Sequence, residues 1–591
     1  MNATFKSFLL LSLVGLTACN QSPSEQANAS NNDDAAITIS DAATGSLQNL
    51  PAAFKLANGT ALTLYKSKAG RVTLWRDGKE QILDTTAPVQ GGQFVQLHEN
   101  AGQVYASWWS HENNKNLYIT HSSDGGRSFG KVAIINDQHG VLPRYSLSFG
   151  DKGVVGATYY DERSPRYEVY FNRSTDYGQT WDRPDTRLDD PAPAGQDNYA
   201  VEPVTVQADG AWVTVWDDAY KGLDGRTVYR LMTRSSTDQG QTWSPAKMLV
   251  SSFHQISALS AKAQGKTVFV AFDEYQAGIK AVVSNDAGTN WLTSPAIEGS
   301  SQKTNSGLVL TIANGMGYAS WIEQEPNKKP DIQFGRFDLA NNAWLGSTQR
   351  IDTKQFDNTQ SITPSIFSFS NGNVVIAWVD YRDIRPNIYL SLSTDQGKTW
   401  SAPKPFGKPG VADLGWPKLI PWGDSVALAY ESYPKDILKD GMFKVAPTNI
   451  MAATKDLPSY ASTSEVSAEQ KKKMLLARID DLWKYRKEGK YEPTYSFFDY
   501  AMRNFMAKKE FVEKSGNLNY YDYELTSTKI EGNVAEVEQK ITYDTKPFMM
   551  PNGKMQQIKK TTAEVKNTWV WIGDNWYLVY APSFGKPILQ Y

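Results

Sequence analysis

The residues best suited to chemistry are acids, arginines and aromatic residues that recur through the middle of this 591-residue chain. Short apolar segments end in an aromatic residue and an acid, as in Tyr159-Tyr160-Asp161, Trp216-Asp217-Asp218, Phe272-Asp273-Glu274, Trp321-Ile322-Glu323 and Trp378-Val379-Asp380. Carboxylates hydrogen-bond to sugar hydroxyls, and aromatic side chains cover the apolar faces of sugar rings. The pattern therefore points to recognition of a carbohydrate.

A second repeat indicates which elements position these groups. The pattern Ser-x-Asp-x-Gly-x-x-aromatic begins at Ser122, Ser174, Ser236, Ser284 and Ser393, and a degenerate copy runs from Phe334 to Trp344 with Asp338. Asp and Ser side chains accept backbone hydrogen bonds in tight turns, and Gly tolerates a positive φ. Each copy belongs to a unit of roughly 50 residues with four short strands, which predicts the blades of a β-propeller.

These motifs resemble the Asp boxes, also called BNR repeats, of the sialidase superfamily. The resemblance implies an all-β propeller, which we place at residues 49–460. We prefer seven blades, in which residues 53–85 and the last unit, ending at Tyr430-Glu431, join in one closing blade. Eight blades are the second choice, and the six of ordinary sialidases are the third.

Propeller topology brings the acids and the residues that open each unit to one end of the axis. The candidates for catalysis on this face are Arg144, Arg163, Arg382, Asp161, Asp380 and Tyr381. The candidates for ligand binding are Glu202, Asp218, Glu274, Glu323 and Trp416. The same face also receives Tyr145, Glu162, Asp217, Asp273, Tyr275, Lys418 and Glu431.

Three functions are compatible with this face: binding of a glycan or another envelope ligand, a sialidase-like exo-glycosidase, or a scaffold for a protein partner. Sialidases use a Tyr nucleophile, and in the family three arginines clamp the substrate carboxylate. Arg144, Arg163 and Arg382 are the candidates for such a clamp. The family's Phe/Tyr-Arg-Ile-Pro motif is absent, and Pro143-Arg144-Tyr145 is its nearest approach.

The same residues also admit a purely structural interpretation. The acids after the aromatic residues can pair with neighbouring blades and accept backbone N–H groups. Asp380-Tyr381-Arg382-Asp383 can form a local ion-pair network. Fold alone does not decide between these interpretations, because function depends on the arrangement of the site.

A different domain is predicted at residues 461–591. Ser467-Ala468-Glu469-Gln470 has the form of a capping box, and the apolar stripe Leu475, Ile479, Leu482 and Trp483 follows it at helical spacing. Strands are predicted at 520–527, 534–543, 561–572 and 576–580. Helices followed by an antiparallel sheet resemble NTF2-like domains, which implies a small α+β cone with a pocket.

The N-terminus is predicted to be a targeting signal. Residues 1–19 hold Lys6, a short apolar run and the tetrad Leu16-Thr17-Ala18-Cys19, which resembles the lipobox of bacterial lipoproteins. The resemblance implies cleavage before Cys19, lipidation of that residue and attachment to the cell envelope through the lipid. Asn20 does not resemble the aspartate that retains lipoproteins in the inner membrane, so we expect the outer membrane. Residues 20–48 are predicted to be a flexible tether.

Composition excludes several classes. With 40% hydrophobic residues the chain is too apolar to be mainly disordered, and a net charge of −2 offers no case for nucleic-acid binding. A single cysteine permits no intrachain disulfide. The five histidines show no metal spacing, and no Gly-rich phosphate loop is present, so we expect neither a metal nor a cofactor.

Overall fold

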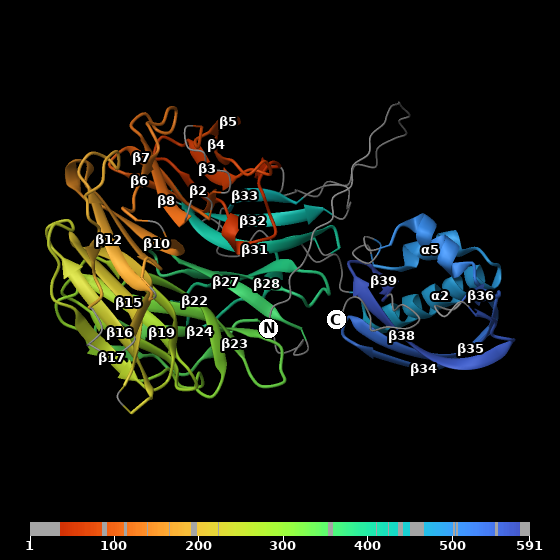
Figure 1. Cartoon of the computed structure of the whole chain (residues 1–591). Helices are drawn as coiled ribbons and strands as arrows, with labels where there is room; N and C mark the ends of the chain where they lie inside the picture. Colours follow the sequence, from red (N-terminus) through yellow and green to blue (C-terminus); the bar gives the residue numbers. More distant parts are fainter. Residues whose placement is uncertain are drawn as a thin grey trace.

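The computed structural model shows a large all-β domain followed by a smaller α+β domain (Figure 1). The colours in Figure 1 run from red through yellow to green along the first domain, and the second domain is blue. The residues that the structure describes are 36–85, 92–111, 115–138, 140–164, 166–190, 198–222, 224–352, 359–408, 410–423, 425–434, 441–448, 466–499, 503, 506–549 and 554–579. The lipobox at Cys19 and the domain boundary near residue 460 lie outside them.

The described part of the first domain forms eight antiparallel sheets, mostly four-stranded. The first four are β2 (Ala52–Lys55), β3 (Ala61–Lys66), β4 (Val72–Arg76) and β5 (Lys79–Ile82); β6 (Gly92–Asn100), β7 (Gln103–Ser110), β8 (Asn116–Ser122) and β9 (Ala133–Ile134); β10 (Val141–Phe149), β11 (Val155–Asp161), β12 (Glu168–Ser174) and β13 (Thr186–Arg187); and β14 (Asn198–Ala208), β15 (Ala211–Lys221), β16 (Thr227–Ser236) and β17 (Lys247–Ser252).

The other four sheets continue in chain order. They are β18 (Ile256–Gln264), β19 (Thr267–Glu274), β20 (Gly278–Ser284) and β21 (Leu292–Thr293); β22 (Thr304–Ala313), β23 (Met316–Gln324) and β24 (Asp331–Asp338), with β25 (Ala343–Trp344) and β26 (Gln349–Arg350) both paired to β24; β27 (Ser361–Ser368), β28 (Val374–Asp380), β29 (Asn387–Ser393) and β30 (Lys404–Pro405); and β31 (Ala412–Trp422), β32 (Ser425–Pro434), β33 (Met442–Thr448) and β1 (Ile37–Ile39). Two short 3₁₀ helices, η1 (Leu47–Asn49) and η2 (Asp151–Gly153), lie between strands.

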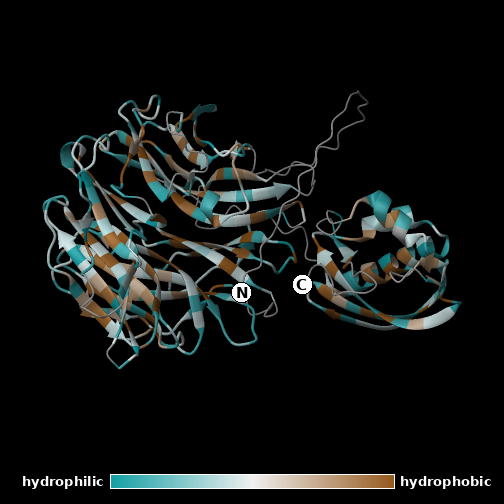
Figure 2. Ribbon diagram, in the orientation of Figure 1, coloured by the Kyte–Doolittle hydropathy of each residue, from teal (hydrophilic) through white to brown (hydrophobic). Residues whose placement is uncertain are grey.

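The eight sheets close into a ring. We call the first long strand of each sheet its inner strand: β2, β6, β10, β14, β18, β22, β27 and β31. Each inner strand packs against the inner strand of the next sheet, and β31 packs against β2. Apolar side chains fill the spaces between neighbouring sheets, and Figure 2 shows the hydrophobic segments in the strands. This arrangement confirms the propeller-like all-β fold.

The preferred count of seven blades is wrong. Residues 52–82 form a sheet of their own instead of joining the last unit. The last sheet is completed by β1, whose Ile37, Thr38 and Ile39 pair with Val445, Lys444 and Phe443. The predicted tether of residues 20–48 therefore extends too far, because this segment supplies a strand and η1 to the propeller.

The five Asp boxes connect the third and fourth strands of their sheets and share one set of hydrogen bonds. In each box the serine Oγ donates to the aspartate Oδ1 at 2.7–2.8 Å and accepts from the glycine N–H at 2.8–2.9 Å. The degenerate copy keeps its aspartate, because Asp338 accepts from the N–H groups of Ala340 and Asn341. The turn chemistry of the repeat is thus confirmed.

Seven inner strands carry a β-bulge at the same position, where the register with the second strand shifts. In six strands two residues are left unpaired, and the first of them is Phe94, Glu202, Ala258, Gly307, Thr363 or Trp416. In β10 three residues, 142–144, are unpaired, and Arg144 is the last of them. We call these seven residues the bulge ring. Five non-glycine members have φ values between 50° and 54°. Bulges redirect side chains, and left-handed backbone at non-glycine residues stores strain that is typical of functional sites.

The second domain packs helices against a curved sheet. Its elements are α2 (Ala468–Lys487), α3 (Tyr491–Thr494), η4 (Tyr495–Phe497), α5 (Lys508–Ser515), β34 (Leu518–Glu531), β35 (Val534–Thr545), β36 (Phe548–Met549), β37 (Met555–Gln556), β38 (Thr561–Ile572) and β39 (Asn575–Leu578). The predicted capping box is present, since Ser467 and Gln470 exchange both hydrogen bonds. The predicted stripe of α2 is buried against β35, β38 and β39. None of the helices in the described ranges could cross a bilayer by its length and hydropathy.

The two domains are in contact. Asn533 donates through Nδ2 to the carbonyl of Arg382 at 2.5 Å. Ile384, in the loop after β28, packs in one buried cluster with Val570, Ile572 and Val579 of the second domain. The second domain therefore rests on the loop that contains the predicted Asp380–Arg382 site.

Candidate functional site

The centre of the candidate site is an ion pair that links three inner strands. Arg144 on β10 donates through Nη1 to Glu202 on β14 at 2.5 Å and through Nη2 to the carbonyl of Leu259 on β18 at 2.7 Å. Their side chains remain 38% and 42% exposed. Two members of the bulge ring thus form an accessible, partly solvated pair at the mouth of the ring.

Asp217, on β15, lies beside this pair. It is opposite Val201, the residue before Glu202, and its Oδ1 has no hydrogen-bond partner among the described residues. Burial, with the nearby charges of Glu202 and Asp218, raises the pKa of Asp217 from an ordinary 3.8 to about 8. At neutral pH it is a carboxylic acid that can donate a hydrogen bond or a proton.

Tyr160 completes the cluster from β11. Its side chain is partly buried, and its pKa is raised by burial and by the charge of Glu202. Its ring makes an edge contact with Tyr167 at a centroid distance of 6.2 Å. Across the ring, four sheets from Glu202, Trp416 occupies the bulge of β31 and is partly exposed. Acid, ion pair and aromatic groups therefore surround one mouth, which we call the channel mouth.

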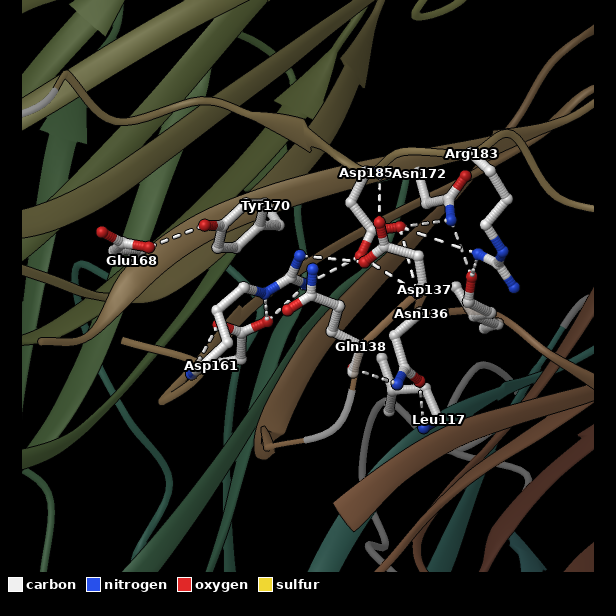
Figure 3. Close-up of polar contacts among 12 residues, drawn as sticks. Leu117, Asn136, Asp137, Gln138, Asp161, Glu168, Tyr170, Asn172, Arg183 and Asp185 are labelled. Carbon is white, nitrogen blue, oxygen red and sulfur yellow. Dashed lines mark hydrogen bonds and ion pairs between the residues drawn. The ribbon is translucent and has the colours of Figure 1, made fainter. Parts of the chain in front are cut away.

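Arg163 and Asp161, two of the candidates for catalysis, belong to an internal ion-pair network. Arg163 donates to Asp161 at 2.6 Å, to Asp137 at 2.9 Å and to Asp185 at 2.7 Å, and its guanidinium lies 3.8 Å from the ring centroid of Tyr170. Figure 3 shows the three carboxylates gathered around this centre. The Arg163 side chain is only 10% exposed, so its donors are used within the protein. This network joins two neighbouring sheets.

Arg382 and Asp380, two further candidates for catalysis, form a local ion pair, and Tyr381 lies between them in the chain. Arg382 makes two hydrogen bonds to Asp380, at 2.9 and 2.6 Å, and stacks 4.2 Å from the ring of Tyr389. The second domain covers this loop through Asn533. Burial raises the pKa of Tyr381, which disfavours its use as a nucleophile. The local ion-pair interpretation therefore describes these residues.

The three arginines do not form a clamp. Arg163 and Arg382 are each only 10% exposed and lie in separate internal ion-pair networks, while Arg144 is paired with Glu202 at the channel mouth. A carboxylate clamp requires planar guanidinium groups that converge on one point. The geometry of a sialidase site is therefore absent from these candidates.

Three of the predicted ligand-binding acids instead hold strands together. Asp218 binds Arg230 through Oδ1, Glu274 pairs with Lys280 at 2.5 Å, and Glu323 pairs with Lys303 at 2.6 Å. All three acids are buried. Each of these predicted ligand-binding acids therefore has a partner within the protein. Glu202 and Trp416, by contrast, lie at the channel mouth as predicted.

Sequence reasoning chose Asp218 over its neighbour Asp217, which carries the unsatisfied oxygen. The parity of the strand decides between them, because adjacent residues point to opposite faces of a sheet. Asp217 could be identified only from the structure. There, Asp217 pairs with Val201, next to the bulge at Glu202, whose φ is 54°. Among the described residues, no group of His, Cys, Asp and Glu is arranged to hold a metal ion.

Comparison with known proteins supports the identification of the repeat as a BNR repeat. Residues 159–413 match the BNR repeat-like domain. Solved structures to which the chain shows similarity include an α-L-arabinanase from Penicillium chrysogenum (16% identity, 52% of this chain, 99% of that chain, TM-score 0.34) and a family PL25 ulvan lyase (12%, 69%, 95%, 0.42). The NanB sialidase from Streptococcus pneumoniae is a third (8%, 69%, 91%, 0.31). No curated protein matches the sequence. The middle of the chain is thus similar to BNR repeat-like domains from β11 into β31.

Proposed function

We propose that this protein is a glycan-binding propeller of the cell envelope, attached through a lipid on Cys19. The observation that carries the proposal is the channel mouth, where the accessible Arg144–Glu202 pair and Trp416 stand on redirected bulges. Charged groups of this kind bind hydroxyls, and an indole ring covers a sugar face. The left-handed backbone at Glu202 and Trp416 indicates that these two side chains are held in place for a ligand.

The anchoring part of the proposal rests on the lipobox resemblance of Leu16-Thr17-Ala18-Cys19. One lipid chain gives reversible attachment, and several chains give stable attachment. Metabolic labelling with an alkyne fatty acid tests it, with Cys19→Ala as the unlabelled comparison. Fractionation of inner and outer membranes tests the expected outer-membrane location. Recovery of unlabelled wild-type protein in the soluble fraction would contradict this part alone.

Glycan binding is tested with a chain that begins at residue 20, probed on an array of envelope and plant oligosaccharides. Trp416→Ala and Arg144→Gln are expected to weaken the binding of every bound glycan by about tenfold or more, because each removes a stacking or charged contact. Arg127→Gln is the matched control, since Arg127 is exposed in an Asp box at the other end of its sheet. Equal binding by all three variants would refute the assignment of the mouth.

Asp217 favours a second function, cleavage of a glycosidic bond. A carboxylic acid that stays protonated near pH 7 beside a second carboxyl group is the pairing that glycosidases use for general acid catalysis. Release of reducing ends from the glycans that bind measures this activity. Asp217→Asn is expected to abolish release while binding persists, and binding without release by the wild-type protein would leave recognition as the function.

A further inference from the structure

The second domain carries an exposed hairpin at the end remote from the propeller. β35 begins at Val534, which packs against the cluster that joins the two domains, and ends at Thr545. Its twelve residues span roughly 35 Å. The hairpin of β36 and β37 continues from this far end, where the N–H of Thr545 donates to the carbonyl of Ile558 at 3.0 Å. Figure 1 shows β36 at the outer end of the domain, so the propeller does not cover it.

Two methionines give the hairpin an apolar surface. Met549 on β36 and Met555 on β37 are opposite each other in the pairing of the two strands. They are 70% and 63% exposed, more than any other large apolar side chain among the described residues. Exposed apolar groups that lie together mark interaction sites, and the flexible thioether of methionine adapts to irregular surfaces. The methionine pair is therefore a candidate contact surface.

The methionines lie in a basic segment. Residues 546–560 contain no Asp or Glu, and their exposed cations are Lys546, Lys554, Lys559 and Lys560. The ammonium groups of Lys546 and Lys559 form no ion pair or hydrogen bond with a described residue. Lys560 lies 4.3 Å from the ring centroid of Tyr521, whose hydroxyl donates to Asp544 at 2.6 Å. The hairpin is thus locally cationic, although the whole chain carries a net charge of −2.

We propose that this hairpin binds a bilayer that contains anionic phospholipids, with both methionines immersed below the headgroups. An apolar tip among lysines is complementary to a surface that holds negative charge above hydrocarbon. A second copy of the same surface would bring like charges together, which disfavours it as the occupant. A lipid chain combined with a basic patch is a stable form of membrane attachment. The hairpin therefore adds a second contact to the lipid proposed on Cys19, and it does not depend on glycan binding.

The test uses the chain from residue 20, which lacks the lipid, and two kinds of vesicle: phosphatidylcholine alone, and equal parts of phosphatidylcholine and phosphatidylglycerol. Sedimentation is expected to show at least about tenfold stronger binding to the anionic vesicles, and added salt is expected to weaken it. Lys546→Gln/Lys559→Gln is expected to weaken this binding about tenfold or more. Met549→Ser/Met555→Ser is expected to weaken it by a similar factor, because it removes the apolar contact.

Two double variants are matched controls. Lys529→Gln/Lys566→Gln removes the same charge from exposed lysines of the same sheet, which pair with Glu531 and Glu536 towards the propeller end. Met248→Ser/Met474→Ser removes two other exposed methionines, 54% and 37% accessible, from β17 and α2. Both variants are expected to bind the anionic vesicles as the wild-type protein does.

A dye attached at the hairpin reports immersion. The chain from residue 20 has no cysteine, so Met549→Cys can be labelled at one position with a nitrobenzoxadiazole dye. Its emission is expected to increase and shift to the blue on anionic vesicles, whereas the dye on Met474→Cys is expected to stay in water.

Three results would overturn the proposal: no binding to anionic vesicles, equal binding by the lysine variant, or a dye at position 549 that stays in water. Self-association that Met549→Ser/Met555→Ser abolishes, without vesicle binding, would assign the hairpin to a second copy instead. None of these measurements involves a sugar or the lipid, so the failure of the proposed function is recognised separately.

Discussion

Replacement of Asp217 by Asn is expected to stabilise the protein, because Asn preserves the neutral form that the site imposes. The pKa of Asp217 rises from an ordinary 3.8 to about 8 on folding. Each pH unit between 3.8 and 8 costs the wild-type protein about 1.4 kcal/mol of folding free energy, since the unfolded chain loses this proton and the folded chain keeps it. At pH 7 the difference amounts to about 4 kcal/mol. Below pH 4 it vanishes.

Urea unfolding of both proteins at several pH values between 4 and 8.5 measures this difference. The stability of the wild-type protein is expected to fall relative to Asp217→Asn as pH rises, and to level off above pH 8. Asp238→Asn, in the same sheet, is the matched control, and we expect it to change the free energy of unfolding in the opposite direction. Its carboxylate accepts three hydrogen bonds and its pKa is lowered, so the variant is expected to lose about 1–2 kcal/mol above pH 4. An Asp217→Asn protein no more stable than wild type at pH 7 would refute a neutral, desolvated Asp217.

Three other substitutions test the fold around the site. Arg163→Gln is expected to lower the free energy of unfolding by about 3–5 kcal/mol, measured in urea, because it leaves three buried carboxylates without their common partner. Ile39→Asp is expected to lower the Tm by several degrees through the closing sheet, whereas Thr38→Asp, exposed on the same strand, leaves it unchanged. Val570→Asp is expected to separate the two domains, with a larger radius of gyration in X-ray scattering and an intact β-sheet circular dichroism spectrum.

The Asp boxes were predictable because their chemistry is local. Ser, Asp and Gly within five positions determine the turn, and five copies determine its period. The number of sheets was not predictable in the same way. The strand that completes the last sheet is only Ile37–Ile39, in a polar segment, and its partner Val445 is far along the chain. No local sequence pattern predicts a pairing between segments so far apart in the chain.

The channel mouth was predictable in part. Glu202 and Trp416 were identified because each precedes a proline that opens a unit. The partners of the acids were not identifiable, because Arg230, Lys280 and Lys303 reach them from other strands. Asp217 and Asp218 have the same side chain and adjacent positions, so only the pairing of the strand shows which one is unpartnered.

The closing strand has a consequence for how the protein is made. Ile37–Ile39 leaves the ribosome first among the described strands, whereas β33 of the same domain, which it must join, comes after seven complete sheets. Each of those sheets can assemble from adjacent segments as synthesis proceeds, but the circle stays open until the end. A chain that ends before β33 leaves β1 without its partner strand, and an unpaired strand can pair with other chains. Premature termination therefore favours aggregation over a smaller working propeller.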